Sequence, residues 1–166
     1  MNNVTVFPIG KIENNEQHVR IILDRAYAQG LNGLDGFSHV QILWWASGCD
    51  NPADRAVVSE RKPYKKGPDA LGVFALRSPE RPNPIAVSNA KIAYMDKNSG
   101  IVDLEFVDAY DGTPVLDLKP YTPSIDRVET AQVPAWCRHW PKSYEESGSF
   151  DWVSEFNFAE DSNGAF

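Results

Sequence analysis

Two arginines, Arg77 and Arg81, lie in a segment whose backbone the sequence makes stiff. Each of the three prolines Pro79, Pro82 and Pro84 fixes its own φ angle and pushes the residue before it towards an extended conformation. The two side chains therefore lose little backbone entropy when they meet a ligand. Because a guanidinium is planar, always charged and bidentate, the pair suits a carboxylate or a phosphate. The alternative is a tight hairpin in which both arginines pair with nearby acids.

A second group of titratable side chains begins at the end of residues 101–109, where apolar and polar residues alternate as in a strand. Asp108 closes the apolar face of this run, so it either is buried and hydrogen-bonded or lines a pocket. Asp111 precedes Gly112 and is expected to serve the turn. Asp117 and Lys119 share one face of the following strand, where a structural ion pair and a catalytic role are both open.

A basic run surrounds Tyr64 and contains Arg61, Lys62, Lys65 and Lys66. Such a loop can hold a phosphate backbone and stack a base, which makes it the candidate contact for an RNA substrate. The commoner fate of a charged run is a solvated surface loop.

The distribution of charge divides the chain in two. The net charge of −7 argues against a nucleic-acid partner, but all 16 Lys and Arg residues lie at or before Lys142, and six of the 23 acidic residues follow it. The body is therefore close to neutral and can carry a basic patch. We divide the chain into a barrel domain, residues 1–142, and an acidic, aromatic tail, residues 143–166. In the tail, residues 150–158 alternate aromatic and polar side chains, which predicts a strand at the barrel edge or against a partner subunit.

The pattern of strand-like runs predicts a mainly β, single-domain antiparallel barrel, with an α+β sandwich as the alternative. Residues 24–31 predict a short helix or turn, and no stretch has a long helical period. The predicted strands are residues 4–12, 19–23, 34–45, 71–76, 85–95, 101–109 and 115–119.

Length and composition fit one globular domain, because 166 residues with 42% hydrophobic side chains can bury one sizeable core. No apolar run reaches membrane-spanning length and the start lacks a signal-peptide pattern, so we expect a cytoplasmic protein. Cys49 and Cys137 are expected to be free thiols, and His18, His39 and His139 lack metal-ligand spacing.

Three segments together resemble the TsaA-like family, which includes the TrmO-type tRNA methyltransferases. They are LDGFSHVQILWW at residues 34–45, GVFALRSPERPNPIAVS at residues 72–88 and DAYDGTPVLDLKP at residues 108–120. The resemblance implies a β-barrel that binds S-adenosyl-L-methionine, usually as a homodimer. It also implies N6-methylation of threonylcarbamoyladenosine beside the tRNA anticodon. The alternatives are a methyltransferase for another RNA or small molecule, and a module that binds the cofactor or RNA without catalysis.

The same resemblance implies cofactor contacts, and the residue types fit them. Arg77 suits the methionine carboxylate, and an apolar slot suits adenine. The chain departs from the family between residues 14 and 19, which leave no room for a Pro-Arg-Gln element. No catalytic residue is singled out, and the candidates are Arg81, Asn83, Asp117 and Lys119. The resemblance implies cofactor contacts at Arg77, Val87, Glu105, Phe106, Val107, Asp108, Ser47 and Gly48, and Trp45 is added because its ring suits the apolar slot for adenine.

Overall fold

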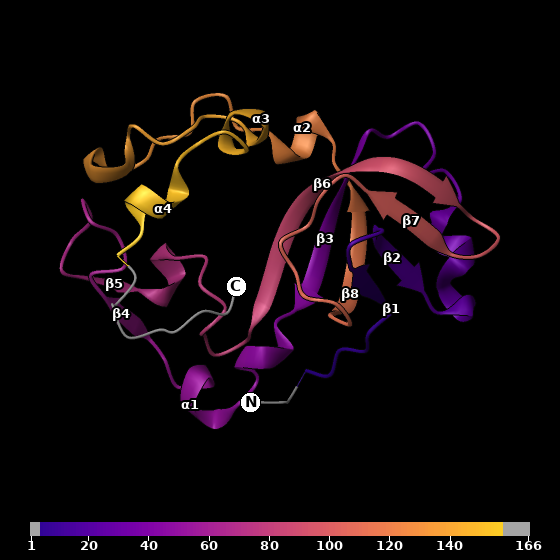
Figure 1. Ribbon diagram of the computed structural model, residues 1–166, viewed down its shortest axis with the longest axis horizontal. Helices are drawn as coiled ribbons and strands as arrows, with labels where there is room; N and C mark the ends of the chain where they lie inside the picture. The colour runs from indigo at the N-terminus through magenta and orange to yellow at the C-terminus, as the bar shows by residue number, and fades with distance from the viewer. Residues whose placement is uncertain (1–3, 158–166) are drawn as a thin grey trace.

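Six antiparallel strands close into a barrel in the computed structural model, which describes residues 4–157 (Figure 1). Neighbours around the barrel follow the order β1-β2-β7-β6-β3-β8, and β8 closes it against β1. The predicted mainly β barrel is therefore confirmed. The strands are β1 (Gly10–Asn14), β2 (Val19–Leu23), β3 (His39–Trp45), β6 (Ile85–Asp96), β7 (Ile101–Leu104) and β8 (Pro114–Pro120).

The barrel is filled by the inward faces of its strands, because successive side chains of a strand alternate between its two sides. On β3, Val40 and Ile42 are fully buried, as the alternation in the sequence predicts. The long strand β6 pairs with β3 along its first half and with β7 along its second, with a register shift at residues 92–94. Together with Val40 and Ile42, the core inside the barrel contains Ile12, Ile21, Leu23, Ala90, Val102, Leu104 and Val115.

A 3-10 helix, η1 (Arg25–Leu31), follows β2 and buries Ala28 and Leu31 against the barrel core. The predicted short helix at this position is confirmed. Its preceding residue Asp24 makes no side-chain capping bond, so packing of the apolar side chains holds this turn rather than a polar cap.

A smaller lobe is inserted between β3 and β6, and it lies beside the barrel in Figure 1. It holds a two-stranded sheet, so the prediction of one barrel strand over residues 71–76 is wrong. Of residues 71–76, only Leu71 and Gly72 lie in a strand, and that strand pairs within the lobe rather than with the barrel. Val73 begins a 3-10 turn that Leu76 follows, and both side chains are buried. The elements of the lobe are η2 (Ser47–Cys49), α1 (Pro52–Arg55), β4 (Ser59–Arg61), β5 (Ala70–Gly72) and η3 (Val73–Ala75).

The chain after β8 crosses from the barrel to the lobe (Figure 1). The prediction of a strand over residues 150–158 is wrong for its described part, because a helical turn forms where Asp151 accepts a bond from the Ser154 amide. Phe156 makes a single bridge to Tyr64 of the lobe, and Phe158 lies outside the described residues. The elements are α2 (Pro123–Asp126), η4 (Ala135–Cys137), α3 (Tyr144–Ser147) and α4 (Trp152–Glu155).

Other predicted strands are present but shorter. Within residues 4–12 the strand begins only at Gly10, and within residues 34–45 it begins at His39. The strand over residues 101–109 ends at Leu104, after which the buried side chains are Val107 and Ala109 rather than Phe106 and Asp108. Within residues 4–157, no helix is both long and apolar enough to cross a membrane. Cys49 and Cys137 are free thiols, as predicted.

Candidate functional site

A cleft of about 600 Å³ lies between the outer side of the barrel and the C-terminal segment. The barrel contributes one wall from β6, from the loop before it and from the chain after β7. The opposite wall comes from the segment that contains α3 and the start of α4. The lining residues are Arg77, Val87, Ser88, Asn89, Phe106, Val107, Asp108, Pro141, Lys142, Ser143, Tyr144, Ser147 and Trp152.

Arg77 follows η3 and reaches across to β6, where its Nη2 donates a 2.9 Å hydrogen bond to the Val87 carbonyl oxygen. The side chain lines the cleft and is exposed to solvent. One backbone carbonyl uses only one of the five N–H donors of a guanidinium. The arginine is thus fixed in position and keeps donors for an anionic group in the cleft.

Arg81 does not line the cleft, although it comes from the same loop. Its Nε donates to the Ser78 carbonyl at 2.9 Å, and its Nη2 donates to the carbonyls of Val73 and Leu76 at 2.6 and 2.7 Å. Val73 and Leu76 are themselves buried. Arg81 therefore ties together the backbone on either side of Arg77, and neither arginine pairs with Glu80 as the hairpin alternative required.

Two polar side chains of β6, Ser88 and Asn89, line the cleft and were not singled out from the sequence. The Trp44 indole Nε1 donates to Ser88 Oγ at 3.0 Å, and Gln41 Nε2 donates to Asn89 Oδ1 at 3.3 Å. Both partners belong to the neighbouring strand β3, so cross-strand register determines these contacts.

The chain after β7 brings Phe106, Val107 and Asp108 to the cleft. Phe106 is 59% exposed and Val107 is buried, so a ring stands at the surface of the cleft above a packed base. Asp108 is exposed and lines the cleft, which is the second of the two environments that the sequence allowed. Glu105 is not among the lining residues, and its carboxylate pairs with Lys91 Nζ at 2.5 Å.

The C-terminal wall of the cleft is the part that sequence reasoning missed. Trp152 is held there by its indole Nε1, which donates to the Ser147 carbonyl at 3.1 Å. Tyr144 is 45% exposed, and its ring meets the His39 ring edge-on at 6.2 Å between centroids. Partial burial raises the pKa of Tyr144, and the nearby carboxylates of Glu105 and Glu145 raise it further. The only sequence signal for this wall is the density of aromatic residues in an irregular stretch.

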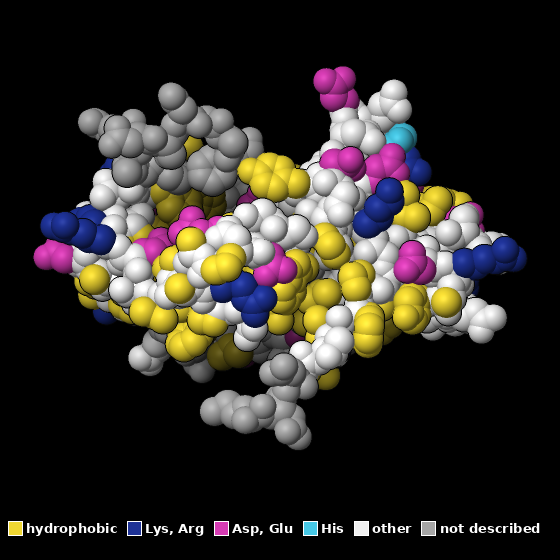
Figure 2. All heavy atoms as spheres, turned by 90° about the horizontal axis from the view of Figure 1, so that it is seen from below, with side chains coloured by type: hydrophobic (Ala, Val, Ile, Leu, Met, Phe, Trp, Pro, Cys, Tyr) yellow, Lys and Arg dark blue, Asp and Glu magenta, His cyan; other side chains and the backbone are white. Residues whose placement is uncertain are grey.

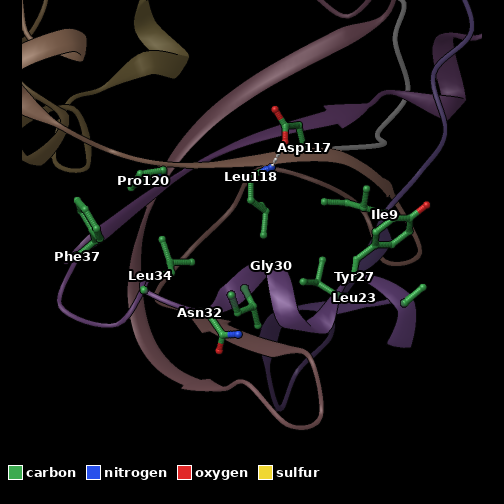
Figure 3. Close-up of a pocket in the computed structure, with 13 residues that line it drawn as sticks. Ile9, Leu23, Tyr27, Gly30, Asn32, Leu34, Phe37, Asp117, Leu118 and Pro120 are labelled. Atoms are coloured by element: carbon green, nitrogen blue, oxygen red, sulfur yellow. Dashed lines mark hydrogen bonds between the residues drawn. The ribbon is translucent and has the colours of Figure 1, made fainter.

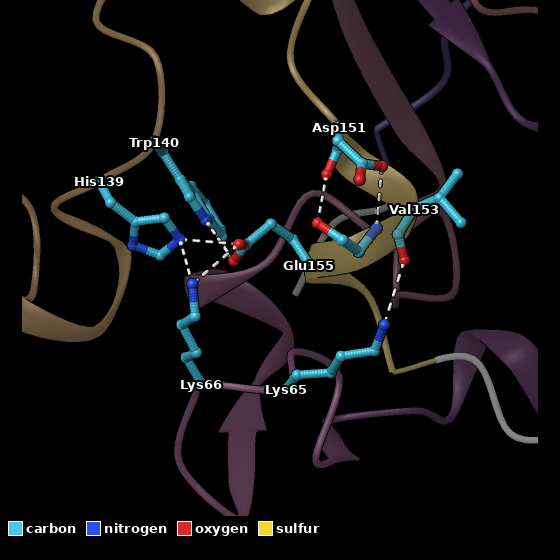
Figure 4. Close-up of polar contacts among 8 residues, drawn as sticks. Lys65, Lys66, His139, Trp140, Asp151, Val153 and Glu155 are labelled. Atoms are coloured by element: carbon cyan, nitrogen blue, oxygen red, sulfur yellow. Dashed lines mark hydrogen bonds and ion pairs between the residues drawn. The ribbon is translucent and has the colours of Figure 1, made fainter.

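The acidic tail is clamped to the lobe by one buried carboxylate, that of Glu155, which is 5% exposed (Figure 4). Its Oε1 lies 2.8 Å from His139 Nε2 and 3.3 Å from Lys66 Nζ, and its Oε2 accepts a 3.2 Å bond from Trp140 Nε1. These donors, with the His139 contact the largest, hold the pKa of Glu155 at about 2 in spite of burial. Around the clamp, aromatic rings pack in one cluster of Tyr64, Trp136, Trp140, Trp152 and Phe156.

The basic run proposed for RNA contact is largely engaged by the protein itself. Lys66 pairs with Glu155, Lys65 Nζ donates to the Val153 carbonyl at 3.4 Å, and Lys62 Nζ donates to the Gly67 carbonyl at 2.8 Å. Arg61 is exposed on β4. On the face drawn in Figure 2, Lys and Arg side chains are scattered among acidic and hydrophobic ones rather than gathered in one patch.

Residues Trp45, Ser47 and Gly48 do not line the cleft. They lie beside the end of the arginine loop, where the Ala46 amide donates to the Pro84 carbonyl and the Trp45 indole donates to Asp50 Oδ2. Asn83, in the same region, is exposed and uses its carbonyl oxygen to accept a bond from the Ile85 amide.

Asp117 and Lys119 form an ion pair of 2.6 Å, one of the two possibilities left open by the sequence. Asp117 borders a different cavity of about 510 Å³, between η1 and β8, which shares no lining residue with the cleft. Figure 3 shows that Leu118 points into this apolar cavity, whereas the Asp117 carboxylate points away from it.

The fold and the cleft define a single-barrel protein with a mixed polar and aromatic site on its outer side. The chain belongs to the family of the tRNA-methyltransferase O N-terminal domain, which matches residues 2–127. This confirms the family resemblance seen in the three sequence segments.

Relatives in this family carry two kinds of name. The tRNA (adenine(37)-N6)-methyltransferase of Escherichia coli is 38% identical over 123 residues, which are 73% of this chain and 51% of that protein. A probable S-adenosyl-L-methionine-binding protein of Methanocaldococcus jannaschii is 32% identical over 119 residues, 72% of this chain and 93% of that protein. The crystal structure of TrmO from Pseudomonas aeruginosa matches with a TM-score of 0.62 at 29% identity, covering 81% of this chain and 62% of that one. The chain thus spans about half the length of the E. coli relative and most of the archaeal one.

Proposed function

We propose that this protein binds S-adenosyl-L-methionine in the cleft and transfers its methyl group to a tRNA adenosine. The observation that carries the proposal is the meeting of Arg77, Val87 and the segment from Phe106 to Asp108 in one cleft. These residues come from separate parts of the chain, and the family resemblance implies each of them as a cofactor contact. Relatives named as S-adenosyl-L-methionine-binding proteins support the same cofactor.

The residue types of the cleft fit the parts of this cofactor. The free donors of Arg77 suit the methionine carboxylate, because charge-assisted bonds to a guanidinium are strong and directional. The exposed ring of Phe106 offers a flat apolar surface to adenine. Asp108 can accept hydrogen bonds from the ribose hydroxyls, or its negative charge can stabilise the positive charge of the sulfonium.

When bound, the cofactor supplies an activated methyl group, so the chain itself needs to supply position and electrostatics. Arg77 would orient one end of the ligand, since its guanidinium is already fixed to the Val87 carbonyl. Val107, buried beneath the cleft, keeps the base of the site dry. In this scheme no covalent intermediate with the protein is required.

We take the methyl acceptor to be the adenosine at position 37 of tRNA, in its threonylcarbamoyl form, with the nitrogen N6 receiving the methyl group. Position 37 and the nitrogen N6 are supported by the name of the E. coli relative, whose matched portion is 51% of its length, and the threonylcarbamoyl form is what the family resemblance implies. The second candidate is a protein that binds the cofactor without this transfer, which the names of the archaeal relatives favour.

Calorimetric titration with S-adenosyl-L-methionine tests the cofactor assignment. Arg77→Ala removes a charged hydrogen bond of ~1.5–3 kcal/mol, so the dissociation constant should rise about 10- to 150-fold. Arg77→Lys should recover little, because the planar fork is lost. Arg25→Ala is the matched control, since Arg25 belongs to η1 and does not line the cleft. Equal affinity in the wild type and Arg77→Ala would refute the assignment.

Incubation with methyl-labelled cofactor and unfractionated tRNA separates the two candidate functions. Label in N6-methylated threonylcarbamoyladenosine after nuclease digestion supports the methyltransferase. Tight cofactor binding without label in any nucleoside supports the second candidate.

A further inference from the structure

One wall of the cleft lies outside the part of the chain that the family matches. The match ends at residue 127, whereas Lys142, Tyr144 and Trp152 line the cleft from the C-terminal segment. All of the cofactor contacts implied by the resemblance belong to the barrel side or to the lobe. The chemistry of the opposite wall is therefore still to be assigned.

This wall is a fixed part of the site, because it is anchored at both ends. His139 and Trp140, which precede the wall in the chain, contact the buried carboxylate of Glu155, which follows the wall (Figure 4). The Lys65 amide also donates to the Glu155 carbonyl at 3.0 Å, which joins the end of the wall to the lobe. A wall held in this way presents its side chains to the cleft without a large entropic cost on binding.

Two side chains of this wall have complementary chemistry. Tyr144 presents a half-exposed ring, and its edge-on contact with His39 fixes the orientation of that ring. Lys142 is exposed, and its ammonium makes no hydrogen bond or ion pair with any residue between 4 and 157. By contrast, Lys62, Lys65 and Lys66 of the basic run are bonded to the protein's own backbone or to Glu155.

The charges in the cleft favour an anionic second ligand. Among the lining side chains Arg77 and Lys142 are cationic and Asp108 is acidic. The carboxylates of Glu105 and Glu145 lie near Tyr144, but neither residue lines the cleft. If Arg77 takes the cofactor carboxylate, Lys142 is left for another negative group. An aromatic ring beside a cation is the combination that binds a nucleotide of single-stranded nucleic acid, by stacking its base and pairing with its phosphate.

We propose that Tyr144 and Lys142 form the acceptor-nucleotide subsite, in which Tyr144 stacks on a base of the RNA and Lys142 contacts an adjacent phosphate. This inference rests on the proposed function, and it moves the main RNA contact from the basic run to the C-terminal wall. The subsite lies after residue 127, beyond the family match, and in this position it would contact the acceptor that enters the cleft.

Binding of unfractionated tRNA, measured by fluorescence anisotropy at several salt concentrations, tests the subsite. Tyr144→Ala should weaken tRNA binding about 5- to 150-fold, the range for loss of one stacked base. Tyr144→Phe keeps the ring and should stay within about twofold of the wild type. Lys142→Ala should weaken binding and lower the slope of log affinity against log salt by about 1.

Matched controls remove the same chemistry elsewhere. Tyr94 lies on β6 and is 61% exposed. Lys97 lies in the turn after β6, where its ammonium pairs with Asp35. Neither Tyr94 nor Lys97 lines the cleft. Tyr94→Ala and Lys97→Ala should leave tRNA affinity within about twofold, since they keep the stacked base and the cleft cation. Unchanged melting temperatures of all variants would show that the fold is kept.

The outcomes distinguish this inference from the proposed function. Cofactor affinity should be unchanged in Tyr144→Ala, and loss of cofactor affinity there would overturn the subsite by assigning the ring to the cofactor. Equal tRNA affinity in wild type and Tyr144→Ala, or no tRNA binding by the wild type at low salt, would also overturn it. Failure of the wild type to bind the cofactor overturns the proposed function alone, because tRNA binding is measured without cofactor.

Discussion

Replacement of Arg81 by alanine separates a positioning role from a catalytic one. The side chain is half-buried and makes three hydrogen bonds to backbone carbonyls, at 2.9, 2.6 and 2.7 Å. A hydrogen bond from a charged group contributes ~1.5–3 kcal/mol, but two of the three share Nη2 and water replaces part of the loss. We therefore expect Arg81→Ala to lower the free energy of unfolding by about 3 kcal/mol.

The measurement is thermal unfolding followed by circular dichroism. For a chain of this size, 1 kcal/mol corresponds to roughly 2–4 °C, so the melting temperature should fall by about 6–12 °C. Arg81→Lys should recover only part of this loss, since one ammonium cannot reproduce the geometry of the fork. Arg25→Ala, on η1, serves as the control and should shift the melting temperature by less than about 2 °C.

The same variant should also weaken cofactor binding, because Arg81 fixes the backbone on both sides of Arg77. The sequence leaves Arg81 among the catalytic candidates. The positioning role would be refuted, and a catalytic role favoured, if Arg81→Ala had the melting temperature and the cofactor affinity of the wild type but no longer transferred the methyl group.

Two further predictions concern the clamp and the barrel seam. Because the pKa of Glu155 is lowered to about 2, its ionised form stabilises the fold above the unfolded value of 4.5, and this contribution is lost as the pH falls towards 2. The urea midpoint of the wild type should therefore exceed that of Glu155→Gln most at neutral pH, with a gap that narrows below about pH 4.5; a constant gap would contradict the clamp. At Gly10, an added Cβ would lie 2.2 Å from the Ile22 carbonyl oxygen and 2.7 Å from Leu23 Cα, so Gly10→Ala should cost about 1–3 kcal/mol by forcing β1 and β2 apart. Gly48→Ala has no atom within 4 Å of the new Cβ and is its control; equal melting temperatures for the two variants would show that the β1–β2 seam yields without cost.

The sequence by itself determined those features that depend on short stretches of chain. Alternation along residues 39–45 identified the buried face of β3, since side chains of a strand point to opposite sides in turn. The prolines around Arg81 indicated a rigid loop, because each one restricts its own backbone and that of its neighbour. The three segments that resemble the family are also short, continuous stretches of chain, so the family and its barrel fold could be predicted together.

The tertiary structure decided which side chains meet. Lys66 and Glu155 are 89 positions apart, and nothing in either local sequence indicates that one would neutralise the other. The same holds for Tyr144, which reaches the cleft because the aromatic tail packs on the lobe. Irregular segments have no period that reveals which side is buried, so their contacts depend on packing across the whole chain. The arginine loop that we propose as an anion site could thus be predicted from its residues, whereas the wall facing it could be found only in the folded structure.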